Sequence, residues 1–446
     1  MSDARAEAVD RSGTVRLPES REAAEALDRA DPLAAKRAAF DMPAGIYLDG
    51  NSLGPLPHAV RRRLRHAIDV EWGEGLIASW NDAGWIDLPS RIGARIAPLV
   101  GAAPEGVRVC DSTSVNLFKV LAAALALRPE RRVIVSERSN FPTDLYVAEG
   151  LSGLLAQGHE LRLVDDASDI VTALDGRTAV LMLTHVDYRT GALHDMKALT
   201  RAAHECGALT VWDLAHSAGA LPVDLEGCGA DFAVGCGYKY LNGGPGAPAF
   251  VAIARRHLAD ARNPLSGWFA HAEPFAFEPT FRATEGADRF LVGTPPVLST
   301  VALDAALDVW SDVDIGMVRE KSLALTGLFI ARVEAECAND AGGATDAGGA
   351  TEAVPSLVSP RLVSPRDGSR RGSQVSFSHP EAHALVRCLI EQGVTGDFRA
   401  PDIARFGFAP LYTRHVDAWD AAARLGEILR TRAHDRPRFH RRRAVT

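Results

Sequence analysis

The sequence has few cysteines, no long apolar run and no excess of basic charge, and each gap excludes a class of protein. Its six cysteines include no CxxC pair, so neither a zinc site nor a dense disulfide framework is indicated. We expect free thiols in a reducing cytoplasm and no bound metal. The longest uninterrupted apolar run, Val120–Leu127, is far too short to cross a bilayer. The N-terminal stretch is polar and carries acids early, so we expect no secretory signal.

Charge and composition exclude further classes. The net charge is −8, from 49 basic and 57 acidic residues, which argues against a general nucleic-acid binder. Hydrophobic residues make up 47% of the chain and charged residues 24%, the ordinary mix of a globular protein with a sizeable core. By length, 446 residues suggest two or three domains.

The middle of the chain alternates strand-like and helix-like segments. A strand pattern at 178–186 is almost continuously apolar, as in a strand covered on both faces. Such alternation predicts a mostly parallel α/β sheet, whose ligands bind at the carboxyl ends of the strands. Polar residues gather where the predicted strands end. The predicted strands are 107–110, 131–137, 178–186, 208–216 and 231–240, with helices at 116–127 and 200–207.

Outside this region the patterns are weaker. We expect helices at 20–40 and 58–72, and a strand followed by an amphipathic helix within 373–394. The repeats DAGGAT and LVSPR mark 340–372 as a disordered surface insertion. The expected domains are a partly disordered N-terminal arm at 1–45, a large α/β domain at 46–300, a small α+β domain at 301–430 and a basic, solvated tail at 431–446.

The strongest chemical signal is an acid at one predicted strand end and a lysine at another. Asp213 lies in the stretch WDLAH, and Lys239 lies in GYKYLNGGPG. A carbonyl cofactor needs a lysine as its covalent partner, and a pyridine cofactor needs a carboxylate that keeps its ring nitrogen protonated. The pair therefore fits pyridoxal 5′-phosphate (PLP). On spacing alone, a strand-end cap and a surface lysine explain these residues equally well.

Three further positions could serve such a cofactor. Asp111–Asn116 lies between a strand and a helix, where hydroxyls and free N–H groups bind phosphate, although a plain helix cap has the same pattern. Phe141 follows a predicted strand and could stack on a ring or belong to the core. His216 is three residues from Asp213 and could equally be an ordinary core histidine.

Several ordered motifs carry a resemblance to a known family. The chain resembles the fold-type-I PLP-dependent enzymes, the class-V aminotransferase-like group, and within them the kynureninase family, over about residues 43–425. The motifs are YLDGNSLGPLP at Tyr47, STSVN at Ser112, NFPTD at Asn140, TGALHDM at Thr190, VWDLAHSAGALPVDL at Val211, GADFAVGCGYKYLNGGPG at Gly229, PLSGWFAH at Pro264 and FAPLY at Phe408.

The resemblance implies a role for each matching residue. Lys239 would bind the cofactor covalently and shuttle protons, Asp213 would pair with the ring nitrogen, and Tyr238 would relay a proton. Arg405 would grip the substrate α-carboxylate. An aromatic pocket including Trp80, Trp85 and Trp268 would receive the substrate ring. The implied cofactor-binding residues are Thr113, Ser114, Phe141, Pro142, Thr143, Asp144, Thr184, Asp213, His216, Tyr238, Lys239, Trp268 and Thr294.

The resemblance also implies a reaction. It is the hydrolysis of L-kynurenine to anthranilate and L-alanine, and of 3-hydroxy-L-kynurenine to 3-hydroxyanthranilate, in tryptophan catabolism and the pathway to NAD biosynthesis. The enzyme would be a cytoplasmic homodimer with shared active sites, Trp268 and Thr294 reaching the phosphate side from the partner subunit. Nucleic acid and membrane are not expected partners.

Three other functions fit parts of the sequence. A cysteine desulfurase or selenocysteine lyase of the same fold needs a reactive cysteine on a loop near the C-terminal domain, and 340–372 contains none. A non-catalytic protein on the same fold is disfavoured by the set of Asp213, Lys239 and Arg405. A nucleotide-binding α/β protein is disfavoured because neither GxxxxGK[ST] nor a GxGxxG in the first strand–helix turn occurs.

Overall fold

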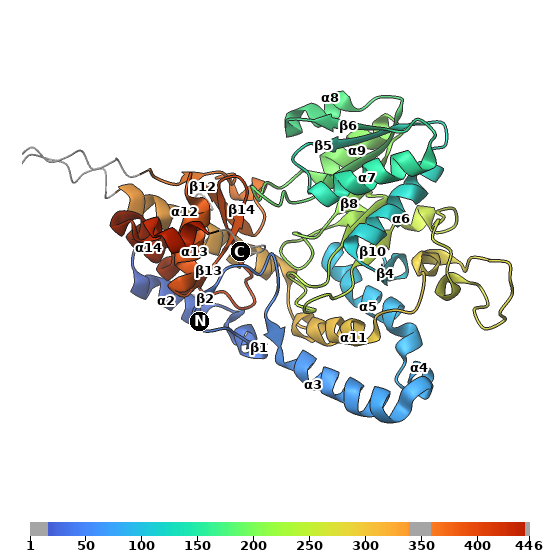
Figure 1. Ribbon diagram of the computed structural model, residues 1–446, viewed down its shortest axis with the longest axis horizontal. Coiled ribbons are helices and arrows are strands. Elements are labelled where there is room, and N and C mark those ends of the chain that lie inside the picture. Colours follow the sequence, from blue (N-terminus) through green and yellow to red (C-terminus); the bar gives the residue numbers. More distant parts are fainter. Residues whose placement is uncertain (1–16, 339–357, 442–446) are drawn as a thin grey trace, which may run out of the picture. The chain divides into compact units, whose positions relative to one another are not determined.

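The structure, a computed structural model, describes residues 17–338 and 358–441 (Figure 1). The chain divides into two compact units. The central unit comprises Ser52–Tyr188 and Ala192–Ile315. The terminal unit comprises the chain up to Asn51, the short segment Arg189–Gly191 and the chain from Gly316 onward. The expected domain limits at residues 45, 300 and 430 stay predictions.

The central unit is built on a seven-stranded sheet in the order β4-β10-β9-β8-β7-β5-β6. Neighbours among β9, β8, β7, β5 and β6 are parallel, whereas β10 runs antiparallel to both β9 and β4. Six strands therefore end at one edge, called here the carboxyl edge. The predicted mostly parallel α/β sheet is confirmed. The strands are β4 (Val107–Val109), β5 (Val133–Glu137), β6 (Glu160–Val164), β7 (Thr178–Thr184), β8 (Leu209–Asp213), β9 (Phe232–Gly235) and β10 (Phe250–Ile253).

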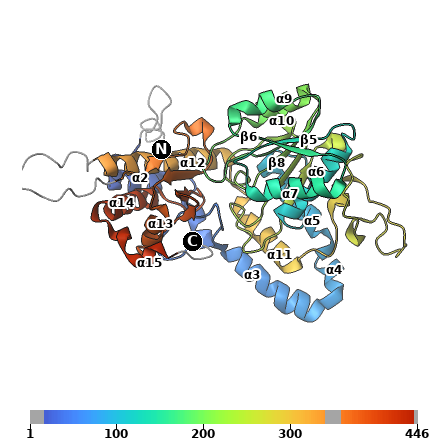
Figure 2. The same ribbon diagram turned by 45° about the horizontal axis from the view of Figure 1, so that its top comes forward.

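Helices cover both faces of this sheet. Figure 2 shows α9 (Met196–Glu205) and α10 (Leu225–Cys228) on one face and α6 (Thr113–Ala126) and α7 (Pro142–Leu155) on the other. Every residue of β7 is buried, which accounts for its continuous apolar run. Alternate strand residues such as Val180, Met182 and Val211 join α6 and α7 in one apolar core. The remaining helices of the unit are α3 (His58–His66), α4 (Ser79–Asp82), α5 (Leu88–Ile96), α8 (Ile170–Ala173) and α11 (Val297–Ala306).

The terminal unit packs helices on an antiparallel sheet of order β11-β12-β15-β14. Its core is aromatic: the ring of Phe329 lies 4.9–6.1 Å from the rings of Phe377, Phe406 and Phe408. The strand and helix predicted within 373–394 are β12 and α13. The elements are α2 (Arg21–Ala30), β2 (Ile46–Tyr47), α12 (Ile315–Ala338), β11 (Arg361–Leu362), β12 (Gln374–Ser378), α13 (Ala382–Glu391), β13 (Val394–Thr395), β14 (Asp397–Arg399), β15 (Ile403–Gly407), α14 (His415–Thr431) and α15 (Pro437–His440).

Each of the two helices predicted near the N-terminus is divided into two helical segments. Instead of one helix over 20–40, α2 ends at Ala30, and a separate 3₁₀ segment covers Ala34–Ala39. Asp31 is extended because the proline that follows it disfavours helical backbone. The helix predicted at 58–72 begins as α3 and continues as a π-helical segment, Ala67–Gly75.

The predicted disordered insertion at 340–372 is wrong for its second part. Residues 339–357 lie outside the described residues, but 358–372 are folded. Arg361 and Leu362 pair with β12, and the Ser364 hydroxyl donates to the backbone oxygen of Thr190 at 2.5 Å. Arg371 is buried and donates to the backbone oxygens of Pro365 and Arg366. Strand pairing, which low complexity did not reveal, stabilises this part.

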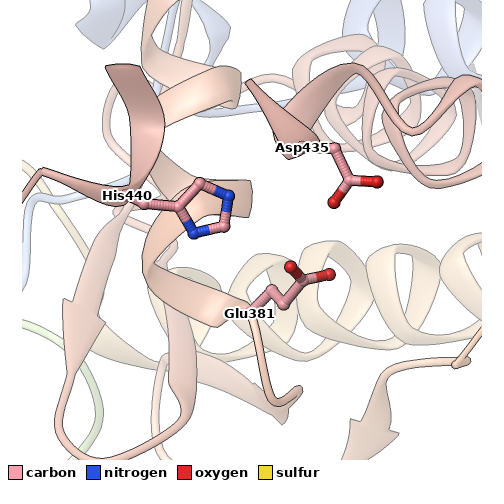
Figure 3. Close-up of side chains that lie close together, drawn as sticks. All are labelled: Glu381, Asp435 and His440. Carbon is pink, nitrogen blue, oxygen red and sulfur yellow. The ribbon is translucent and has the colours of Figure 1, made fainter. Parts of the chain in front are cut away.

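The basic tail is not wholly solvated either, since residues 431–441 fold against α13. Phe439 is 3% exposed and belongs to the core of the terminal unit. Figure 3 shows Glu381, Asp435 and His440, whose carboxylate and ring atoms lie within 4.8 Å of one another. Glu381 also contacts His434 Nε2 at 3.2 Å. One aromatic anchor therefore outweighs the charge of the segment. Residues 442–446 lie outside the described residues, and no helix among those described is long and apolar enough to cross a membrane.

Candidate active site

Asp213 ends β8 at the carboxyl edge. It shares the alternating face of Leu209 and Val211, which pack into the core with α6 and α7, so its carboxylate points to that face. The side chain is 5% exposed, and Oδ1 accepts from the backbone N–H of Ala215 at 2.8 Å. Thr184, at the end of β7, pairs with Asp213 in register. Asp213 therefore does cap a turn, as the simpler interpretation required, but it is also a buried acid at the edge where ligands bind.

Lys239 follows the neighbouring strand, β9. Its Nζ lies 3.3 Å from Nε2 of His216, which is itself buried. Lys239 is half-buried rather than fully exposed, which argues against a plain surface lysine. Gly54 contacts the loop that carries Lys239: its N–H donates to the backbone oxygen of Tyr238 at 2.9 Å. A Cβ at Gly54 would lie 2.6 Å from the backbone oxygen of Lys239, so only glycine fits there.

Two buried aspartates, Asp144 and Asp213, interact electrostatically with Lys239. Burial raises the pKa of Asp144 well above its usual value, the negative charge of Asp213 raises it further, and the positive charge of Lys239 opposes both. Burial likewise raises the pKa of Asp213, again opposed by Lys239. Among the described residues, Oδ2 of Asp144 is buried without a hydrogen-bond partner. The site therefore places two carboxyl groups whose ionised forms are disfavoured near one lysine.

Tyr238 and Cys236 are neutral at physiological pH. Burial raises the pKa of the Tyr238 phenol, and the neighbouring Cys236 and Asp213 raise it further. Burial also raises the pKa of the Cys236 thiol. Tyr238 is therefore a phenol that can donate a proton to a neighbour, which is the form a proton relay requires.

Two helix N-termini complete this edge of the central unit. Ser112 caps α6, its hydroxyl accepting from the backbone N–H of Val115 at 3.4 Å. The predicted phosphate residues Thr113 and Ser114 are thus the first two residues of a 14-residue helix, where N–H groups are available to an anion. The plain-cap interpretation holds for Ser112, which leaves Thr113 and Ser114 for another role.

The second N-terminus is that of α7. It begins at Pro142, directly after Phe141, and includes Thr143 and Asp144 in its first turn. Phe141 is 38% exposed, so it is not an ordinary core residue. Its ring meets that of Tyr188 edge-on, with centroids 5.2 Å apart. Tyr188 was not among the predicted site residues, although the polar residues around the end of β7 pointed to this region.

The aromatic residues predicted for the substrate ring lie together. The Trp80 ring centroid is 6.4 Å from that of Trp85 and 5.8 Å from that of Trp268. Trp268 also stacks on Phe269 at 4.9 Å. Thr294 is exposed just before α11. No contact of the described chain joins Trp268 or Thr294 to Lys239, and their cofactor roles stay predictions.

Arg405 belongs to the terminal unit and lies in the middle of β15. It is 2% exposed, and its Nε donates to Oδ1 of Asp397 at 2.8 Å. Its Nη2 also donates to the Asp397 carboxylate. With the amide oxygen of Asn51 turned toward it, Nε lies 3.0 Å from that oxygen. Sequence reasoning missed Asp397, which faces Arg405 in the β14–β15 register. The role of Arg405 as a substrate clamp stays a prediction.

Comparison with known proteins places the chain in a family. Residues 46–338 match the family Aminotransferase class-V, and residues 350–425 match the Kynureninase C-terminal domain. A kynureninase of Burkholderia mallei (strain ATCC 23344) is 53% identical, covering 96% of this chain and all of the relative. A kynureninase of Pseudomonas fluorescens is 52% identical, covering 94% and 98%.

Solved structures agree on the fold. A mutant of C-DES with glycine covalently linked to its PLP cofactor has a TM-score of 0.73 at 17% identity, covering 88% of this chain and 99% of that one. A cysteine desulfurase from Thermococcus onnurineus NA1 has a TM-score of 0.67 at 19% identity, covering 94% and 99%. At these identities the likeness shows the fold alone. The chain, matched over nearly its whole length by enzymes more than half identical to it, belongs to the kynureninase family of PLP-dependent class-V aminotransferase folds.

Proposed function

We propose that this chain hydrolyses the Cβ–Cγ bond of L-kynurenine to give anthranilate and L-alanine, with PLP as cofactor and Lys239 as the residue that binds it. The observation that carries the reaction is 53% identity with kynureninases over 96% of the chain. We propose 3-hydroxy-L-kynurenine as a second substrate of the same reaction. The proposal places the reaction in the cytoplasm, in tryptophan catabolism and the route to NAD biosynthesis.

The residues at the carboxyl edge fit PLP. A cationic ring nitrogen would relieve the raised pKa values of Asp213 and Asp144, because it stabilises their ionised forms. The α6 N-terminus, with the hydroxyls of Thr113 and Ser114, suits a phosphate. When bound, PLP withdraws electrons from the substrate and so permits the loss of a proton from Cα and the later cleavage of the Cβ–Cγ bond.

Lys239 has two tasks. Its Nζ would hold the cofactor, and the same atom would accept the proton that leaves the substrate Cα. His216, 3.3 Å from Nζ, orients the lysine. Asp213 would keep the ring nitrogen protonated, and the carboxyl group of Asp144, which interacts with Asp213, would support it. Further proposed cofactor contacts are those of Phe141, Pro142, Thr143, Thr184 and Thr294.

Other residues handle the substrate. Tyr238 Oη donates and recovers a proton, because its phenol stays neutral. Arg405 binds the α-carboxylate, with Asp397 holding its guanidinium plane in place. The indoles of Trp80, Trp85 and Trp268 receive the aniline ring. A homodimer with shared active sites, in which Trp268 and Thr294 serve the partner, is part of the same proposal.

The test uses the purified holoprotein. Adding L-kynurenine is expected to shift the cofactor absorption band and to release fluorescent anthranilate and alanine in equal amounts. Borohydride treatment followed by peptide mapping is expected to label Lys239. A label on another lysine would refute the Lys239 assignment alone, and the absence of anthranilate would refute the reaction. Sulfide released from cysteine instead would favour the desulfurase alternative.

A further inference from the structure

An ion pair between a fully buried lysine and a partly exposed aspartate lies at the turn that leads into α6. Lys119 is 0% exposed, and its Nζ donates to Oδ2 of Asp111 at 2.6 Å. The same ammonium donates to the backbone oxygen of Phe290 at 2.6 Å and to Sγ of Cys110 at 3.3 Å. An ammonium has three N–H donors, so these three contacts use all of them. The position of Nζ is thereby fixed.

Asp111 needs such a restraint. Its φ is +47°, in the left-handed region that non-glycine residues rarely adopt. It is followed at once by Ser112, the cap of α6, and by Thr113 and Ser114. The backbone direction at Asp111 therefore decides where the first N–H groups and hydroxyls of α6 point. Its backbone oxygen accepts from the N–H of Ala249 at 2.9 Å, so main chain and side chain are both held.

Asp111 supplies the charge that balances Lys119. Burial raises the pKa of the Cys110 thiol, so that group is neutral, and it donates to the amide oxygen of Asn116 at 3.3 Å. Burying an ammonium costs free energy because it loses its water, so an ion pair with a buried lysine is often no more stabilising than apolar residues of similar volume. Stability alone therefore does not explain a lysine here, whereas the geometry of the turn does.

The third contact extends the restraint. Phe290 ends a 3₁₀ segment, Gly286–Phe290, and lies four residues before Thr294. Lys119 thus joins the turn before α6 to the stretch of chain that leads to Thr294, which the proposed homodimer assigns to the phosphate site of the partner subunit. The hydrogen bonds to Asp111 and to the backbone oxygen of Phe290 are both donated by the buried ammonium of Lys119.

We propose that Lys119 and Asp111 are positioning residues that fix the turn Ser112–Ser114 for the phosphate group of the cofactor. This inference rests on the proposed function, which assigns Thr113 and Ser114 to that phosphate. The proposed function assigns neither residue of the pair to a cofactor contact. They act by holding the helix N-terminus in the orientation that an anion needs.

The test compares two ligands that differ only in the phosphate. Apoprotein is titrated with PLP and with pyridoxal, and the two dissociation constants are measured from absorbance. For Lys119→Met the dissociation constant for PLP is expected to rise about tenfold or more, since charge-assisted phosphate contacts are lost. That for pyridoxal is expected to change less than about twofold. The control is Lys197→Met, which removes an exposed lysine of α9 and should change neither constant.

Asp111→Asn guards against a misfolded Lys119 variant. Asparagine tolerates positive φ but lacks the charge, so the loss for PLP should be in the same direction and smaller. The double variant should lose no more affinity for PLP than Lys119→Met alone, because the two residues act as one unit. Equal losses for PLP and pyridoxal would show a merely structural role and overturn the proposal, as would no loss for PLP. Failure of the unmodified protein to bind PLP would instead refute the proposed function.

Discussion

The two edges of the central sheet each carry a buried aspartate, and the two acids behave in opposite ways. At the carboxyl edge, burial raises the pKa of Asp213. At the other edge, Asp231 precedes β9 and is 1% exposed. Burial would raise its pKa too, but hydrogen bonds from His204 and His257 and the positive charge of Arg256 lower it strongly.

The difference is the one expected between an acid that stabilises the fold and an acid that takes part in the proposed reaction. Asp231 is saturated with donors from the fold, including the backbone N–H of Thr210 at 2.8 Å, so its ionised form stabilises the native chain. Asp213 and Asp144 are buried close to each other with one lysine beside them, so ionising them destabilises the native state. A protein keeps such acids where chemistry needs them.

The largest expected effect is at the lysine of the carboxyl edge. Lys239→Ala should lower anthranilate formation at least about a thousandfold, because both the covalent partner of the cofactor and the base at Cα are lost. Turnover is measured by anthranilate fluorescence, with Lys197→Ala as the control. Turnover retained by Lys239→Ala would remove this lysine from the mechanism.

Matched substitutions of the two aspartates test the comparison directly. Asp213→Asn should lower kcat at least about a hundredfold, while the apoprotein should resist urea at least as well as the unsubstituted chain, because the cost of ionising a buried acid is removed. Asp231→Asn should leave the kcat of the folded enzyme within about twofold and lower the free energy of unfolding by about 2 kcal/mol, since its basic partners lose their acceptor. If both variants lost stability equally, the contrast between the edges would be false.

The third prediction carries the comparison into the terminal unit. Arg405→Ala should raise KM for kynurenine about tenfold to a hundredfold with a smaller change in kcat, because a charge-assisted contact to the carboxylate is lost. Arg405→Lys keeps the charge but not the paired donors and should recover only part of the affinity. An unchanged KM in initial-rate measurements would mean that Arg405 serves Asp397 alone.

The smallest expected effect concerns pH and stability. A carboxyl with a raised pKa binds its proton more tightly in the folded chain, so apoprotein stability falls as pH rises above about 4, the unfolded value. Asp144→Asn removes this penalty and should stabilise the apoprotein at pH 7 by about 1 kcal/mol or more, a gain that vanishes toward pH 4. Urea unfolding across this range measures it. A gain independent of pH would assign the effect to packing.

Much of the carboxyl edge could be predicted because strand periodicity and strand ends are local properties. The pattern around Asp213 and Lys239 predicted two strand ends that carry chemistry, and the structure shows that β8 and β9 are neighbours in the sheet. What could not be predicted depends on partners distant in sequence. Asp397 faces Arg405 only through strand register, Asp144 gains its raised pKa only beside Asp213, and Phe439 folds the tail only because the core accepts its ring.

The close approach of Gly54 to the Lys239 loop links two stretches that are far apart in the gene. Since no side chain fits between them, a change of backbone position in one stretch requires a matching change in the other. A chimera that exchanges the NSLG stretch between relatives must therefore exchange the lysine loop with it.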